Sequence, residues 1–325
     1  MRRETMRLLV SGGCGFIGSR FILDHLEKKP EDSILCLDKL TYAANRDIPD
    51  IARSVSDKFD FVKGDIADRD CVFSVFESFR PDAVVNFAAE THVDRSIEDP
   101  MPFVASNVNG TATLLDACLK YGTPRFHQVS TDEVYGEYNG SPDKGFDEGA
   151  PLCPSSPYAA TKAASDMLAL SYFRTYGLFV TVTRGANTYG ERQYPEKLIP
   201  KTIRLALDKE PVPVMGDGSA RRDWIFVGDH ARAIEYVLEK GTPGEIYNVP
   251  GESELANIDT VKRVLSLVGA DSELVRFVPE RLGHDARYLI NGEKLKDLGF
   301  SHEVTFDKGL EYTVKRYLEI YRCVR

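Results

Sequence analysis

The feature that most constrains this chain is a glycine-rich turn near its amino terminus. Residues 8–18 read LLVSGGCGFIG, an apolar strand followed by glycines at positions 12, 15 and 18, where a helix should begin. Gly12 allows a tight turn, Gly15 allows the backbone to approach a ligand closely, and Gly18 lets the helix pack against the strand. Phosphate groups fit the positive end of such a helix. The turn therefore predicts a strand–helix–strand unit that binds a dinucleotide.

The rest of the first half alternates short apolar runs with amphipathic stretches. We predict strands at residues 7–11, 34–37, 59–62, 83–87, 126–130 and 179–183. We predict helices at residues 16–28, 69–79, 103–121 and 157–176. Strands and helices that alternate in this way form a parallel sheet covered by helices on both faces.

After about residue 184 the alternation loosens. Short predicted helices near 195–208, 229–239 and 257–268 are separated by turns rich in proline and glycine, and an amphipathic helix follows from Phe306 to Tyr321. We therefore expect an α/β fold: a Rossmann-type doubly wound parallel sheet with a smaller C-terminal α+β cap that binds the substrate. The expected domains are 1–184 for the dinucleotide and mainly 185–325 for the cap, with some later segments returning to the first domain.

Composition disfavours several other functions. The chain has 325 residues, 42% of them hydrophobic, which is enough for a large core. Its net charge of -9 disfavours nucleic acid and anionic membranes as partners. No apolar run approaches the roughly 18 residues that span a bilayer, and the apolar stretch 8–10 is too short for a signal peptide. The six cysteines are scattered without metal-ligand spacing, so we expect reduced thiols, no metal site and a cytoplasmic protein.

Acidic residues after the next two predicted strands bear on the choice of cofactor. Asp38 closes the second strand, 20 residues beyond Gly18, where a carboxylate accepts hydrogen bonds from an adenosine ribose. Because a carboxylate repels a ribose 2′-phosphate, NAD is favoured over NADP, a preference that the neighbouring Lys39 weakens. Asp65 follows the third strand and has two possible roles, a contact to adenine or the cap of the helix at 69–79.

Two further segments carry candidate catalytic groups. Tyr158 and Lys162 are four residues apart on a predicted helix, so both lie on one face. A free phenol has a pKa of ~10, and a nearby ammonium together with a positive nicotinamide ring favours its ionised form. Asp132 and Glu133 follow a strand, and adjacent carboxylates raise each other's pKa, so that one can remain protonated as an acid. The bland interpretations are a surface helix that happens to carry Tyr and Lys, and solvated loop charges.

With these motifs in place, the chain resembles the nucleotide-sugar 4,6-dehydratases of the extended short-chain dehydrogenase/reductase family. The segments AAETHVDRS (88–96), STDEVYG (130–136) and YPEKLIP (194–200) carry the resemblance, which covers residues 6–321. It implies a lyase in which C4 of the sugar is oxidised by NAD, water is lost across C5 and C6, and hydride returns to C6. The implied catalytic residues are Thr131, Asp132, Glu133, Tyr158 and Lys162.

The resemblance also implies binding residues. The implied cofactor contacts are Gly12, Gly15, Phe16, Ile17, Gly18, Asp38, Lys39, Leu40, Thr41, Asp65, Ile66, Ala88, Ala89, Thr91, Ser106, Tyr158, Lys162 and Thr188. The implied substrate contacts are Thr131, Asn187, Lys197, Leu198, Pro213, Arg222, Asn257, Arg281 and His284. The chain departs from the family pattern at Cys14, Thr188, Leu282 and Met215, the last in place of an aromatic residue that stacks on the base, but no departure removes a catalytic group.

Several functions stay open at this point. Residues 283–285 and 223–224 resemble the dTDP branch of the family, whereas 183–185 and 200–201 resemble the UDP-glucose branch, so dTDP-glucose is favoured over UDP-glucose as substrate. A 4-epimerase or decarboxylase of the same fold is less favoured, and so is a non-catalytic NAD-binding scaffold. The resemblance implies a homodimer, with the helices at 101–121 and 157–176 packed as a four-helix bundle.

Overall fold

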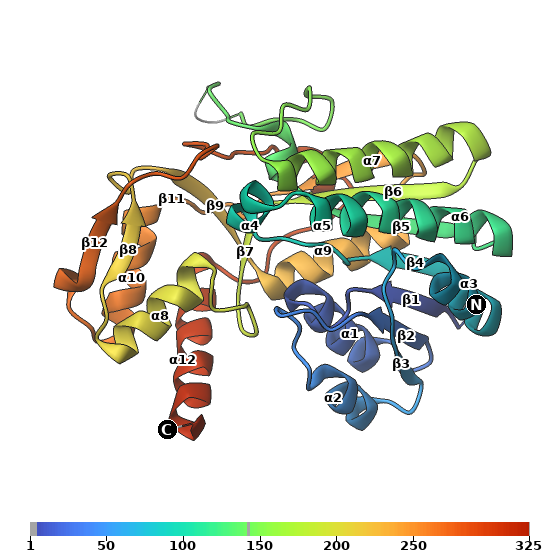
Figure 1. The fold of residues 1–325 in the computed structure, drawn as a ribbon, viewed down its shortest axis with the longest axis horizontal. Helices are drawn as coiled ribbons and strands as arrows, with labels where there is room; N and C mark the ends of the chain where they lie inside the picture. The colour runs from blue at the N-terminus through green and yellow to red at the C-terminus, as the bar shows by residue number, and fades with distance from the viewer. Residues whose placement is uncertain (1–4, 142–143, 325) are drawn as a thin grey trace.

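The structure, a computed structural model, describes residues 5–141 and 144–324. A twisted parallel sheet lies between two layers of helices, and a smaller body packs beside it (Figure 1). The main sheet has the strand order β10-β6-β5-β4-β1-β2-β3. Its strands are β1 (Arg7–Ser11), β2 (Ser33–Asp38), β3 (Phe59–Lys63), β4 (Ala83–Asn86), β5 (Arg125–Thr131), β6 (Phe179–Gly185) and β10 (Glu245–Val249). The prediction of a doubly wound parallel sheet is confirmed.

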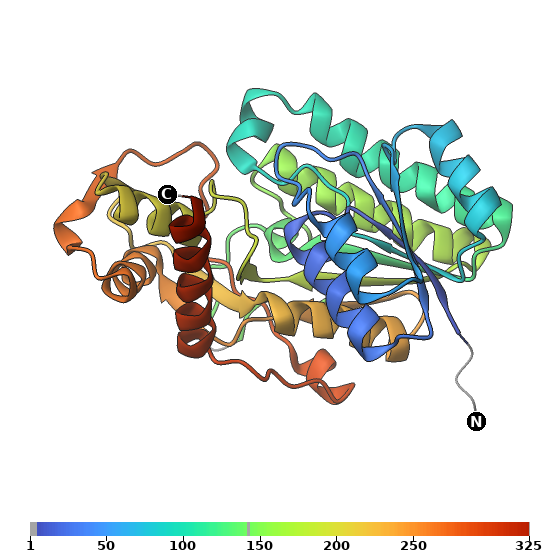
Figure 2. The same ribbon diagram turned by 90° about the horizontal axis from the view of Figure 1, so that it is seen from below.

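Alternating side chains of the strands supply a core on each face of this sheet. On β1, Leu8 and Val10 pack with residues of α1 (Phe16–Lys28) and α9 (Val227–Lys240). Leu9 points to the other face and belongs to the core with α3, α6 and α7. The bounds of these three helices are Arg69–Phe79, Thr111–Tyr121 and Pro157–Tyr176. Burial on both faces explains the apolar runs at the centres of β1, β2 and β4. Figure 2 shows the sheet between the two layers.

The strand order places a crevice where the dinucleotide is expected. The chain winds outward from β1 through β2 to β3 and in the opposite direction through β4, β5 and β6. The loops that follow β1 and β4 therefore diverge at the carboxyl edge of the sheet, which is where ligands bind in folds of this kind. The glycine turn follows β1, and the loop from Phe87 follows β4.

The smaller body is built mainly from the last third of the chain. It contains the sheets β11-β9-β7 and β12-β8. Its strands are β7 (Asn187–Tyr189), β8 (Val212–Met215), β9 (Arg221–Phe226), β11 (Glu254–Ala256) and β12 (Val275–Val278). Its helices are α8 (Leu198–Asp208), α10 (Asn257–Val268) and α12 (Phe306–Val324). Since β10 pairs with β6 in the main sheet, residues beyond position 184 serve both bodies; the domain boundary itself stays a prediction.

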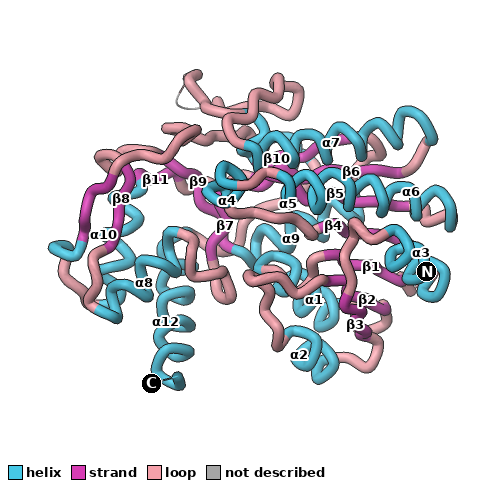
Figure 3. Tube along the Cα trace, in the orientation of Figure 1, coloured by secondary structure: helices cyan, strands magenta, loops and turns pink. Residues whose placement is uncertain are grey.

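The remaining short elements lie in the loops between these strands and helices (Figure 3). They are α2 (Ile48–Val55), α4 (Val93–Glu98), α5 (Met101–Phe103), η1 (Val104–Gly110), η2 (Asp132–Tyr135), η3 (Ser272–Leu274) and α11 (Glu293–Asp297). The single helix predicted at 103–121 is wrong in detail, because η1 is a π-helix between α5 and α6. A π-helix closes i→i+5 hydrogen bonds, but over seven residues the apolar pair Val104 and Val108, four positions apart, fits either kind of helix. Such segments often occur at functional sites.

Two further observations concern the described residues only. No helix within them is both long and apolar enough to cross a membrane. The thiols of Cys14, Cys36, Cys71, Cys118 and Cys153 are free, whereas the side chain of Cys323 lies outside the described residues.

Candidate active site

The glycine turn meets the loop after β4 at the crevice between β1 and β4. Gly12 has a φ of +70°, and a Cβ on it would lie 2.5 Å from the backbone nitrogen of Ala88. A Cβ on Gly18 would lie 2.6 Å from the carbonyl oxygen of Gly12. Any larger side chain must therefore displace backbone at both positions. The turn has the close packing that a dinucleotide fold requires.

The helix that follows this turn offers unsatisfied donors. Gly15 is the N-cap residue of α1, and it makes no side-chain capping hydrogen bond. The first N–H groups of a helix have no partner within the helix, and the helix dipole is positive there. The amino end of α1 therefore suits a pyrophosphate, in agreement with the sequence prediction.

Asp38 at the end of β2 fixes the other side of this region. Its carboxylate accepts hydrogen bonds from the backbone N–H of Cys14 (2.9 Å) and of Leu40 (2.8 Å). Burial raises the pKa of Asp38. The carboxylate thus ties the glycine turn to the loop that follows β2. Leu40 was predicted as a cofactor contact, but it does not line the cavity. Its N–H donates to the carboxylate of Asp38 instead.

The alternative of Asp65 as the cap of the helix at 69–79 is wrong. Asp68 is the N-cap residue of α3, and its side chain accepts from the N–H groups of Asp70 and Cys71. Asp65 lines the cavity, and its Oδ2 lies 3.4 Å from Nζ of Lys39. The structure therefore places Asp65 where the contact to adenine was predicted, while the contact itself stays a prediction.

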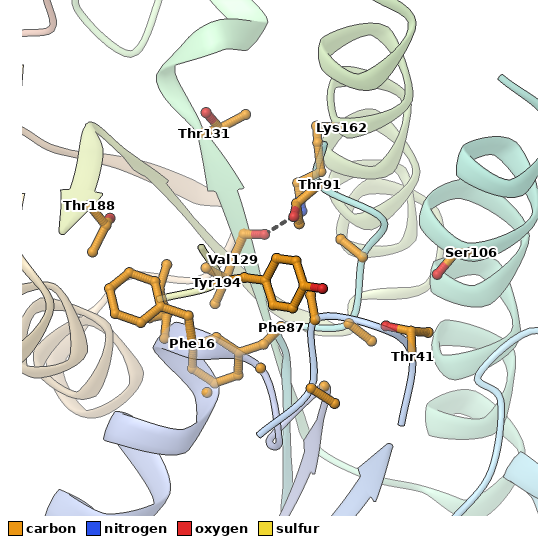
Figure 4. Close-up of a pocket in the computed structure, with 18 of the residues that line it drawn as sticks. Phe16, Thr41, Phe87, Thr91, Ser106, Val129, Thr131, Lys162, Thr188 and Tyr194 are labelled. Atoms are coloured by element: carbon orange, nitrogen blue, oxygen red, sulfur yellow. Dashed lines mark hydrogen bonds between the residues drawn. The ribbon is translucent and has the colours of Figure 1, made fainter. Parts of the chain in front are cut away.

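A continuous cavity runs from the glycine turn to the catalytic helix (Figure 4). The predicted cofactor residues that line it are Gly12, Gly15, Phe16, Ile17, Gly18, Asp38, Lys39, Thr41, Asp65, Ile66, Ala88, Ala89, Thr91, Ser106, Tyr158, Lys162 and Thr188. All five predicted catalytic residues line the same cavity. A ligand bound along the glycine turn would therefore reach the reactive side chains.

Helix α7 begins next to this cavity and buries Tyr158 and Lys162, the predicted catalytic pair. Ser156 caps the helix by accepting from the N–H of Ala159 (3.2 Å). Lys162 donates from Nζ to the carbonyl oxygen of Val129 at 2.6 Å, as Figure 4 shows. Burial lowers the pKa of Lys162 to about 8.

The pKa of Tyr158 differs from the sequence expectation. Burial raises the pKa of this phenol, and the negative charges of Glu133 and Asp132 raise it further, while a hydrogen bond with Thr131 opposes the rise. We expected Lys162 to lower this pKa. In the polypeptide without a cofactor, burial and the carboxylates raise it instead.

The two adjacent carboxyls lie on η2, directly after β5. Thr131 caps this turn, because its Oγ1 accepts from the N–H of Glu133 (3.3 Å). Asp132 is buried, and burial followed by Glu133 raises its pKa well above the usual value. Burial also raises the pKa of Glu133, but the nearby cations Lys197, Arg281 and Arg222 oppose that rise. Environments that differ in this way suit Asp132 to be the acid and Glu133 the base.

The predicted substrate residues divide into two groups. Thr131, Asn187 and Lys197 line the cavity, whereas Leu198, Pro213, Arg222, Asn257, Arg281 and His284 lie outside its lining. Three buried polar atoms of these side chains have no hydrogen-bond partner among the described residues: Oδ1 of Asn187, Oδ1 of Asn257 and Nε of Arg281. Because buried polar atoms are nearly always paired, these atoms are candidates for ligand contacts.

Sequence reasoning missed one buried histidine that lines the cavity. Nδ1 of His230 lies 2.7 Å from Oγ1 of Thr188, and its Nε2 is buried without a partner among the described residues. Burial lowers the pKa of His230 to about 4, so the ring is neutral. The two residues are 42 positions apart in the chain, and no local pattern connects them.

Comparison with known proteins gives consistent matches along the chain. A family model for GDP-mannose 4,6 dehydratase matches residues 9–313. The low-salt glycan biosynthesis protein Agl12 of Haloferax volcanii is 48% identical over 96% of this chain and 99% of its own. The dTDP-glucose 4,6-dehydratase of Streptomyces niveus is 46% identical over 96% and 93%. The crystal structure of the dTDP-glucose 4,6-dehydratase DesIV from Streptomyces venezuelae with NAD bound is 44% identical, with a TM-score of 0.92 over 98% of each chain.

Proposed function

The chain belongs to the GDP-mannose 4,6 dehydratase family, and from this premise we propose that it converts dTDP-glucose to dTDP-4-keto-6-deoxyglucose. The enzyme is a hydro-lyase. Of the features described, the adjacent carboxyls of buried Asp132 and half-buried Glu133 carry the proposal furthest. A reaction that only oxidises or epimerises C4 needs no separate acid and base for removing water. The fold alone does not choose between these reactions, since one fold supports many.

NAD fits the residues of the cavity. Gly12 and Gly18 leave no room for a side chain where the pyrophosphate passes, and the uncapped end of α1 offers donors to it. Asp38 lines the cavity and would accept hydrogen bonds from ribose hydroxyls, which favours NAD over NADP. NAD supplies a hydride acceptor for C4 and a hydride donor for C6, so that the cofactor is regenerated in each turnover.

Oxidation at C4 requires a base for the 4-hydroxyl group. Tyr158 takes this proton, and Thr131 holds the same hydroxyl through its Oγ1. Lys162 stabilises the ionised phenol with its positive charge, while its hydrogen bond to Val129 holds the ammonium at 2.6 Å from that carbonyl. The high pKa of free Tyr158 keeps the phenol protonated until a positive charge is bound nearby.

Removal of water needs the two carboxyls to act in opposite directions. The ketone at C4 acidifies the hydrogen at C5, and Glu133 removes it. Asp132 gives its proton to the departing 6-hydroxyl, which leaves as water. The raised pKa of Asp132 keeps that proton available, and the cations around Glu133 oppose the rise that burial causes in its pKa, which favours the carboxylate form. Together they eliminate one water molecule across C5 and C6. When hydride returns to C6, Glu133 gives its proton back to C5, which completes the 4-keto-6-deoxy sugar.

The remaining site residues and the nucleotide are part of the proposal. We assign the diphosphate and base to the predicted substrate residues Asn187, Lys197, Leu198, Pro213, Arg222, Asn257, Arg281 and His284. The choice of dTDP rests on residues 283–285 and 223–224 and on the names of the relatives. UDP-glucose is the second candidate, and residues 183–185 favour it.

We also propose a cytoplasmic homodimer. Met101 and Met167 expose 64% and 65% of their surfaces on α5 and α7. Leu119 and Tyr176, on α6 and α7, are exposed as well. An apolar face on neighbouring helices suits the four-helix dimer contact. Light scattering on the purified protein would give twice the mass of one chain. The double variant Met101→Glu with Met167→Glu would have the mass of a single chain.

The function is tested by product mass. Purified protein with NAD is incubated separately with dTDP-glucose and with UDP-glucose, and Tyr158→Phe serves as the matched inactive variant. We expect dTDP-glucose to lose one water much faster than UDP-glucose does, and the variant to leave both unchanged. Faster loss from UDP-glucose would keep the reaction and overturn the nucleotide, and an unchanged mass with both would contradict the reaction.

A further inference from the structure

A carboxylate lies one helical turn beyond the catalytic lysine. Asp166 follows Lys162 by four residues on α7, so both project from the same face toward the sheet. The side chain of Asp166 is fully buried, and its Oδ2 lies 2.9 Å from Nε of Arg184 on β6, whose side chain is 3% exposed. A buried acid and a second buried cation therefore lie directly behind the catalytic pair.

Arg184 is held in place from its other side. Its guanidinium lies over the ring of Tyr135, 4.7 Å from the centroid. The hydroxyl of Tyr135 donates to Oδ1 of Asn248 at 2.8 Å. The guanidinium is thus fixed between Asp166 and a tyrosine that is itself anchored, so its charge has one position.

The charges in this cluster do not cancel. Lys162 and Arg184 are positive and Asp166 is negative, which leaves one net positive charge. Burial raises the pKa of Asp166, and Arg184 opposes that rise more strongly than Lys162 does. If Asp166 had only Lys162 as a partner, the two charges would cancel and little positive potential would reach Tyr158.

We propose that Arg184 is a positioning residue that takes up the charge of Asp166, so that the charge of Lys162 acts on Tyr158. The inference rests on the proposed function, because it concerns the same phenol and the same reaction. It assigns a role to a buried ion pair, and buried ion pairs as a class add little net stability.

Other titratable groups face this cluster from the neighbouring elements. Glu133 and Asp132 on η2 act on Tyr158 together with Asp166. The negative charge of Asp166 raises the pKa of Lys162 and so opposes the effect of burial. Both η2 carboxyls are unchanged in the variants proposed next, so they shift every profile equally and leave the differences between variants to Arg184 and Asp166.

The test is the acid limb of kcat/KM against pH, which reports the ionisation of the essential base. The NAD-saturated protein is compared as parent, Arg184→Met, Arg184→Lys and the double variant Arg184→Met with Asp166→Asn, using the keto product's absorbance in alkali. We expect Arg184→Met to move the acid limb upward by about one pH unit, a roughly tenfold loss at neutral pH. Arg184→Lys keeps the charge and the parent's acid limb.

The double variant separates charge from packing. It removes the negative charge of Asp166 together with the positive charge of Arg184, so the acid limb should lie below that of Arg184→Met and move back toward that of the parent. An unshifted limb in folded Arg184→Met, or an upward shift in the double variant equal to that of the single variant, would overturn the inference. If Arg184→Met does not fold, the double variant decides, because it leaves no lone buried carboxylate. A parent inactive on both nucleotide sugars would overturn the proposed function instead.

Discussion

The cofactor end and the substrate end of the molecule encode their sites in different ways. At the cofactor end, Gly12, Gly15 and Gly18 lie on one turn, and all three line the cavity. At the substrate end, Arg222 lies on β9 and Asn257 on α10, and neither lines it. A site made of backbone can be recognised from a short sequence, whereas one made of side chains from separate elements cannot. The predictions that follow test this contrast, beginning with the point where the two ends meet.

The largest effect is expected at that meeting point. Asp132→Asn with Glu133→Gln removes the acid and the base while leaving Tyr158 and Lys162. We expect turnover to fall by at least about 10³-fold, the size of a general acid–base contribution. Oxidation at C4 should continue, so absorbance at the wavelength of reduced nicotinamide should rise and persist after mixing with dTDP-glucose.

The matched control is Glu137→Gln, an exposed acid just after the same turn. It should retain the parent's turnover. Release of keto product by the double variant at the parent's rate would mean that Asp132 and Glu133 do not remove water, and the link between the two ends would then lie elsewhere.

A backbone site should depend on the absence of a single Cβ. Gly12→Ala places that atom 2.5 Å from the nitrogen of Ala88, where backbone must move. We expect NAD affinity to fall at least about tenfold, equivalent to about 1.4 kcal/mol. Gly122→Ala is matched to it, since Gly122 has the same φ of +70° but no atom within 4 Å of its added Cβ.

Both glycine variants lose some stability, because alanine at positive φ is strained. Calorimetric titration with NAD distinguishes them, and the affinity of Gly122→Ala should equal that of the parent. Equal NAD affinity in Gly12→Ala and the parent would contradict the assignment of the glycine turn.

At the substrate end, one side chain should matter without affecting the cofactor. Arg222 is buried, donates to the carbonyl of Asp285 at 2.9 Å and lies near the two carboxyls. We expect Arg222→Met to raise KM for the nucleotide sugar roughly tenfold, the loss of about 1.4 kcal/mol of charge-assisted binding. Arg221→Met on the same strand, with an exposed side chain, should leave KM unchanged. If Arg222→Met weakened NAD binding as much as it raised KM for the nucleotide sugar, the cofactor end and the substrate end would not be distinct in this way.

The smallest effect is expected on stability, at a buried residue that belongs to neither the cofactor end nor the substrate end. His127 on β5 is buried, its nitrogens lie 2.8 and 3.0 Å from the hydroxyls of Thr181 and Thr183, and burial lowers its pKa to about 3. Its pKa in the folded state is below the unfolded value of about 6.5, so its contribution to stability is complete above that pH and is lost as pH falls.

For this one residue, lowering the pH from 6.5 to 5.5 should cost about 1 kcal/mol in the free energy of unfolding. Urea denaturation of the parent and of His127→Asn at both pH values would show that the free energy of unfolding falls more in the parent than in the variant. The same decline in both proteins would mean that His127 is not neutral in the folded state.

How far the sequence predicts the structure follows the same contrast. The strands β1 to β6 and the positions of Tyr158 and Lys162 were predictable, because burial on both sheet faces and the helical repeat leave direct patterns. The π-helix at 104–110 was not, since its apolar spacing resembles that of an α-helix. The contact between Thr188 and His230 joins separate elements and has no local signal. The four-residue spacing of Asp166 from Lys162 was visible in the sequence. The ion pair of Asp166 with Arg184 was not, because Arg184 comes from the neighbouring strand β6.

The central claim is that one closed site removes hydrogen from C4 and returns it to C6 of the same sugar. The direct measurement uses dTDP-glucose labelled with deuterium at C4, in unlabelled water with NAD, followed by nuclear magnetic resonance of the product. We predict that the deuterium is found on C6 of the dehydrated sugar. Deuterium still on C4 of a sugar that has lost no water, or washed out into solvent, would contradict the account.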